Sequence, residues 1–84
     1  MFYIYGAEGS KATEKAENLL MASMQQHKTF IFGRDYTVEQ LYKLHPNTKQ
    51  IPHVYHGFTY VGGVKELYDY LYTVNKFYGE ENDN

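Results

Sequence analysis

The sequence predicts one α/β domain, in which a β-α-β unit is followed by a short helix, a β-hairpin and a last helix. Short apolar and aromatic runs near 1–5, 29–32 and 53–61 are typical of strands. Elsewhere, apolar residues recur every three or four positions, which indicates helices. Glycine, proline and polar residues separate these segments, so the order is β-α-β-α-β-β-α.

Composition limits the classes of function. The chain has 84 residues, of which 43% are hydrophobic, enough for one core. The net charge is −2 without a basic patch, so we expect no binding to nucleic acid. No apolar run approaches the roughly 18 residues of a membrane span, and the first residues lack a charged leader, so we expect a cytoplasmic protein. There is no cysteine, which excludes a disulfide framework and a thiolate metal site.

The first half of the chain predicts a strand, a helix and a second strand. Met1–Tyr5 is short, apolar and aromatic, as buried strands are. After the loop Gly6–Gly9, Ser10 is a candidate N-cap because its hydroxyl can accept a hydrogen bond from the first turn. The helix is expected from Lys11 to Gln25 or Gln26, and the second strand at Thr29–Phe32. The apolar face of this helix consists of residues at helical spacings: Ala12, Ala16, Leu19, Leu20 and Met24.

A short helix follows. Thr37 and Gln40 have the spacing of a capping box at its start, and Pro46 ends it. Its predicted inner face consists of Val38, Leu41, Tyr42 and His45.

The stretch 51–67 predicts a hairpin and the start of the last helix. Pro52 lacks an N–H and suits the beginning of a strand, and His56-Gly57 suits a tight turn. Gly62 and Gly63 allow positive φ or a close approach to the main chain. The helix is expected from Val64 to Phe77. Residues 79–84 are acidic and polar, and we expect a disordered tail.

These elements predict a four-stranded mixed sheet flanked by helices on both faces. The β-α-β unit requires a right-handed crossover between parallel strands, and the hairpin is antiparallel.

Ile51-Pro52, the hairpin, and Val61-Gly62-Gly63 leading to Leu67 resemble the C-terminal half of the glutaredoxins, small proteins of the thioredoxin fold. The resemblance covers residues 1–78, which we treat as a glutaredoxin-like domain. It implies a cis-proline, a central first strand and a glycine pair that opens the last helix. The small size also resembles that of the compact glutaredoxins of bacteria and bacteriophages. If the protein is viral, we expect it in the host cytoplasm.

The redox cysteines of that family are replaced in this chain. Matching Tyr5-Gly6 and 15–20 to the family places Ser10 and Thr13 at the two cysteine positions. In glutaredoxins a thiolate at this helix start is the nucleophile of disulfide exchange. A hydroxyl forms no disulfide and does not ionise usefully without a neighbouring base. We therefore expect no thiol–disulfide exchange from this sequence, and whether the protein is an enzyme stays open.

The resemblance also implies part of a glutathione site. The backbone of Ile51 would pair with the cysteinyl unit, and Lys49 would hold the glycyl carboxylate. Gly62 and Gly63, before the last helix, would receive the γ-glutamyl carboxylate. Ala7 and Lys65 depart from the family, which commonly has a lysine and an aspartate at these positions. Any binding of glutathione should therefore be weak, and we expect no other cofactor.

Each of these residues also has a structural interpretation. Ser10 is more simply an N-cap than a nucleophile, and Thr13 is more simply a solvated residue in a first helical turn. Pro52 and the glycine pair, 62–63, are required by the fold in this family. Lys49 is more simply a solvated loop charge.

His53 and His56 could suggest a metal pair, because histidine is a common ligand. Residues three apart on a strand point to opposite faces, so we expect no metal site here.

Three functions remain open. The first is a redox-inactive, monomeric binding module that holds a peptide or protein partner in the groove beside Pro52. The second is a cysteine-substituted form of an active glutaredoxin, a glutathione-dependent disulfide reductase that donates electrons, for instance to ribonucleotide reductase. The third is a non-redox enzyme that uses Ser10, for which no base is evident.

Overall fold

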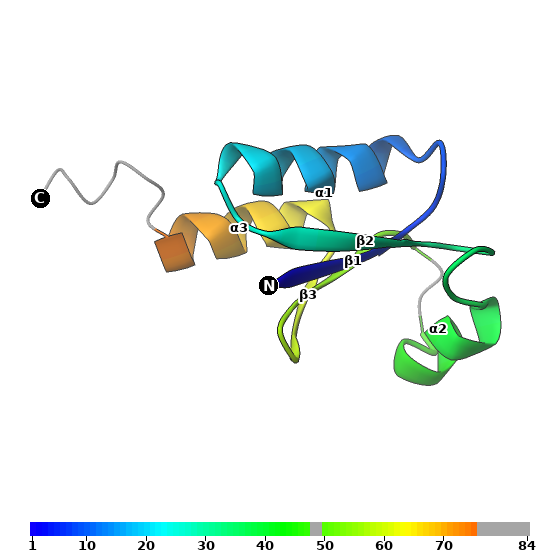
Figure 1. Ribbon diagram of the computed structural model, residues 1–84. Coiled ribbons are helices and arrows are strands. Elements are labelled where there is room, and N and C mark those ends of the chain that lie inside the picture. Colours follow the sequence, from blue (N-terminus) through cyan, green and yellow to red (C-terminus); the bar gives the residue numbers. More distant parts are fainter. Residues whose placement is uncertain (48–49, 76–84) are drawn as a thin grey trace, which may run out of the picture.

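The computed structural model describes residues 1–47 and 50–75 and confirms the predicted order of elements (Figure 1). The elements are β1 (Phe2–Gly6), α1 (Lys11–Ala22), β2 (His27–Ile31), α2 (Val38–Leu44), β3 (His53–His56), β4 (Thr59–Gly62) and α3 (Val64–Asn75). The predicted tail and the end of the domain at residue 78 lie outside the described residues.

The four strands form one mixed sheet in the order β2-β1-β3-β4. β1 is parallel to β2 and antiparallel to β3, and β3 is antiparallel to β4. α1 supplies the crossover between the two parallel strands, as the β-α-β pattern requires. With three flanking helices, this α/β arrangement is that of a thioredoxin-like fold, and β1 lies inside the sheet.

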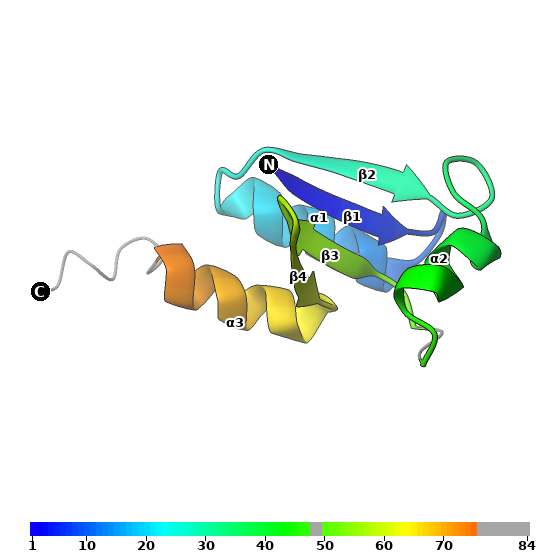
Figure 2. The ribbon, with the colours of Figure 1, turned by 90° about the horizontal axis from the view of Figure 1, so that it is seen from below.

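The helices cover the two faces of the sheet unequally. α1 and α3 lie on one face, and α2 lies on the opposite side, near one end of the strands (Figures 1 and 2). The core lies between the sheet and the two long helices. Its buried side chains are Phe2, Ile4, Ala16, Leu20, Val54, Leu67 and Leu71. Because strand residues alternate between faces, Tyr3 and Tyr5 point to the side where α2 lies.

α1 is shorter than its apolar pattern predicts. It ends at Ala22, and Ser23 caps it by donating its hydroxyl hydrogen bond to the Leu19 carbonyl at 2.6 Å. Met24 follows with φ 58, a left-handed conformation that cannot continue a helix. Its side chain is 89% exposed, so the predicted place of Met24 on the apolar face is wrong.

α2 confirms its predicted start and corrects its predicted inner face. Thr37 and Gln40 form the capping box, with both hydrogen bonds present. Leu41 is buried, whereas Val38 and Tyr42 are exposed, because this short helix lies at the end of the sheet and not across it.

Candidate functional site

Ser10 is the N-cap of α1, as the sequence predicts. It has extended backbone angles, and its Oγ accepts the Thr13 N–H at 3.1 Å. The side chain is half-buried. No hydrogen bond joins its hydroxyl to a His, Asp or Glu side chain of the described residues, so Ser10 has no activating base there.

Thr13 is buried, at 3% exposure, so its interpretation as a solvated residue is wrong. Its Oγ1 accepts the Ala7 N–H at 3.2 Å, which ties the loop after β1 to the first turn of α1. The side chain packs against Gly6, where an added Cβ would lie 2.4 Å from Thr13 atoms. The approach of β1 to the helix therefore buries this residue, and its hydroxyl serves the fold.

The predicted binding residues around the proline lie together. The Ile51–Pro52 peptide bond is cis, as the resemblance implies. A cavity of about 430 Å³ separates the start of α1 from the start of α3. Its lining includes Ala12, Ile51, Pro52, Gly63, Lys65 and Glu66, and we call it the cis-proline groove. Ser10 and Thr13 do not line it, and Lys49 lies outside the described residues.

Ile51 lines this groove. Its side chain is half-buried, and the strand pairing of β3 begins only at His53. No backbone hydrogen bond involves Ile51 within residues 1–47 and 50–75. An extended ligand could therefore pair with the Ile51 main chain without displacing a backbone–backbone hydrogen bond from within these residues.

A second cavity, of about 310 Å³, adjoins the groove and shares Pro52, Gly63 and Glu66 with it. We call it the Glu66 pocket. Its remaining wall includes His53, Tyr60 and Gly62.

Glu66 is the residue of this site that sequence reasoning missed. Its Oε1 accepts the Gly63 N–H at 3.0 Å. The resemblance assigns this N–H to the carboxylate of a ligand, but here the Glu66 carboxylate already binds it. Hydrogen bonds from the backbone N–H groups of Glu66 and Gly63 lower the pKa of this carboxyl, and Lys65 adds to the effect. Gly62, at φ 127, permits the close approach, since an added Cβ would lie 2.7 Å from Glu66 Cβ. The three-residue spacing of Gly63 and Glu66 was the available signal.

Lys65 extends along α3 beside this site. Its Nζ lies 3.7 Å from Asp69 Oδ2, four residues further along the helix, and both side chains are exposed. Position 65, where the resemblance implies an aspartate, therefore carries an ion-paired cation.

The two histidines of β3 lie on opposite faces, as the strand alternation predicts. The ring of His53 stacks on His45 at 4.1 Å, and that of His56 stacks on Phe2 at 4.1 Å. Burial lowers the pKa of all three histidines, and the charge of His45 further lowers that of His53. No group of three or more His, Asp or Glu side chains in the described part of the chain could hold a metal ion.

Two tyrosine hydroxyls complete the stacked histidine pair. Tyr55 Oη and His45 Nε2 are hydrogen-bonded at 2.7 Å, and Tyr60 Oη and His53 Nδ1 at 2.8 Å. These contacts connect the end of α2 to β3 and β4.

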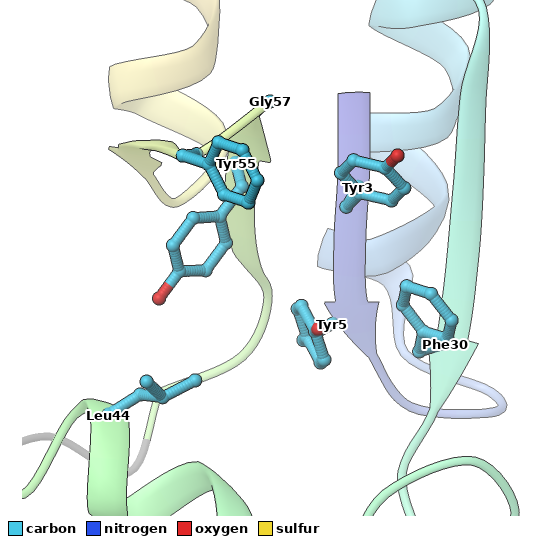
Figure 3. A pocket seen from close by; sticks show the side chains of 7 residues that line it. Tyr3, Tyr5, Phe30, Leu44, Tyr55 and Gly57 are labelled. Atoms are coloured by element: carbon cyan, nitrogen blue, oxygen red, sulfur yellow. The ribbon is translucent and has the colours of Figure 1, made fainter. Parts of the chain in front are cut away.

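An aromatic pocket of about 320 Å³ lies on the sheet face away from α1 (Figure 3). Tyr3, Tyr5, Phe30 and Tyr55 come to it from three strands, and Leu44 comes from α2. It has no carboxylate, amine or imidazole in its lining, so it offers packing and tyrosine hydroxyls but no acid–base pair.

Comparison with known proteins finds no matching family model and no significantly similar curated protein. Within the described residues, no helix has the length and apolar character that crossing a membrane requires.

Proposed function

We propose that this chain is a redox-inactive, glutaredoxin-like protein that binds an extended peptide segment of a partner protein in the cis-proline groove. The main observation in support is Ile51, which lines a cavity of about 430 Å³ and makes no backbone–backbone hydrogen bond within the described residues. A peptide laid beside it would gain main-chain hydrogen bonds, as in strand addition.

The chemistry of the groove favours binding over catalysis. The chain has no thiol, Ser10 accepts a helix-capping bond, and Thr13 closes a loop. Neither hydroxyl lines the cavity. We further propose that the protein acts as a monomer in the cytoplasm, and in the host cytoplasm if it is viral.

Titration with a capped neutral pentapeptide, acetyl-Ala-Val-norleucine-Val-Ala-amide, tests this function. We expect amide shifts at Ile51 and Gly63 in ¹⁵N NMR spectra, with an affinity of about millimolar because short peptides lose much conformational freedom. Ala12→Phe should fill the groove and abolish the shifts. Ala22→Phe, at the other end of α1 and exposed, is the matched control. Absence of shifts in the unsubstituted protein would contradict the proposal.

The second candidate is a cysteine-substituted form of a glutathione-dependent disulfide reductase. The position of Ser10 favours it, because a thiol at this N-cap would face the helix dipole and ionise readily. Ser10→Cys together with Thr13→Cys should then restore reduction of a small disulfide by glutathione. A folded double variant without this activity would exclude the second candidate.

A further inference from the structure

The charge of the Glu66 pocket indicates which peptides the groove selects. We propose that this pocket binds a cationic side chain, the guanidinium of arginine or the ammonium of lysine, from a peptide lying in the cis-proline groove. This inference rests on the proposed peptide-binding function and specifies the chemistry of the partner.

The first argument is the sign of the local charge. A helix N-terminus carries about half a positive charge, which by itself would attract an anion. The Glu66 carboxylate is bonded to that terminus through Gly63 and carries a full negative charge, so it overcompensates the dipole. Lys65, which precedes Glu66 in the sequence, is ion-paired with Asp69 along the helix. The start of α3 is therefore a better site for a cation than for a second carboxylate.

The second argument is the aromatic wall. The side chain of Tyr60 lines the pocket with Glu66 and is 44% exposed, so a ligand can reach it. Its hydroxyl is held by His53 Nδ1 at 2.8 Å. A carboxylate beside an accessible aromatic ring is a favourable environment for guanidinium and ammonium groups, which interact with both.

The third argument is the buried histidine of this pocket. His53 lines the same pocket and is 2% exposed. Burial lowers the pKa of this imidazole and the charge of His45 lowers it further, whereas a hydrogen bond with the Gln50 backbone raises it by less. The histidine is therefore neutral at pH 7 and does not compete with an incoming cation.

Three capped pentapeptides that differ only in the central residue provide the test: arginine, norleucine and glutamate. We expect the arginine peptide to bind about three- to thirtyfold more tightly than the norleucine peptide, from the carboxylate and the aromatic ring together. The glutamate peptide should bind most weakly. The readout is the dissociation constant from NMR shifts at Gly62 and Gly63.

Glu66→Gln isolates the charge, because a glutamine carbonyl can still accept the Gly63 N–H. This variant should lose the preference for arginine, whereas Glu8→Gln, in the exposed loop after β1, should keep it at the same net charge. Equal binding of the arginine and norleucine peptides would overturn the cation pocket and leave the groove intact. A preference that survives in Glu66→Gln would also overturn it. Binding of no peptide would contradict the proposed function itself.

Discussion

Acidification should destabilise this protein before its carboxylates titrate, because three histidines are buried or half-buried and have lowered pKa values. The pKa values of His45, His53 and His56 are all lowered from the ordinary 6.5, chiefly by burial. A histidine with a lowered pKa binds fewer protons in the folded protein than in the unfolded one, so the free energy of unfolding falls as the pH drops below 6.5. Asp35 and Glu66 also have lowered pKa values, but their losses begin near their ordinary values of 3.8 and 4.5.

The size of the effect follows from this linkage. A histidine that stays neutral in the folded protein contributes a loss of about 1.4 kcal/mol between pH 7.5 and pH 5.5. The three histidines together therefore give an upper limit of about 4 kcal/mol. Solvent access to His45 and His56, which are half-buried, lowers their shares. Urea unfolding followed by circular dichroism at the two pH values measures the difference.

One substitution isolates the contribution of the stacked His45–His53 pair to this pH dependence. His45→Phe keeps a ring against His53 and removes one titrating group, so it should reduce the acid-dependent loss by up to about 1.4 kcal/mol. Leu44→Phe adds a ring at the neighbouring position without changing any titratable group and should leave the loss unchanged. Equal stability of the unsubstituted protein at both pH values would refute the reasoning, as would an undiminished loss in His45→Phe.

Three further substitutions test the local packing by urea unfolding. Thr13→Val should lower the free energy of unfolding by about 1–3 kcal/mol, because it leaves the Ala7 N–H without an acceptor. The exposed Thr73→Val should leave it nearly unchanged, and equal effects of the two substitutions would contradict the role of that hydrogen bond. Leu67→Ala should lower the free energy of unfolding by about 2–5 kcal/mol, and Leu44→Ala, at an exposed position, by less than about 0.5 kcal/mol. Similar values for the two would mean that the core lies elsewhere. Gly62→Ala should cost at least about 1 kcal/mol, because its φ is 127 and the new Cβ would approach Glu66; an unchanged midpoint would contradict this close approach.

Local patterns were sufficient for much of the fold. The cap at Ser10 and the capping box of Thr37 and Gln40 each join residues that are three apart. Such local hydrogen bonds can be predicted from a short stretch of sequence. The aromatic and β-branched runs similarly predicted every strand, although β2 begins two residues before the predicted Thr29.

Some of what the sequence did not show concerns contacts between different elements. Thr13 is buried because β1 ends against α1 at Gly6, and a helical pattern alone does not show that approach. The stack of His45 on His53 likewise joins α2 to β3. Glu66 is a different case, since its capping distance from Gly63 is local and was available from the sequence.

Thr13 and Glu66 both form hydrogen bonds within the chain, so the local structure at these positions needs no thiol and no ligand. A threonine at position 13 fills a buried site and accepts a loop hydrogen bond, so the first turn of α1 is well formed without a thiol. Glu66 satisfies the start of α3 without any ligand. Both helix ends that border the cis-proline groove are thus stabilised by the chain itself. These hydrogen bonds form without a ligand or a thiol, and under the proposed function the selectivity of the groove would depend on the charge of Glu66.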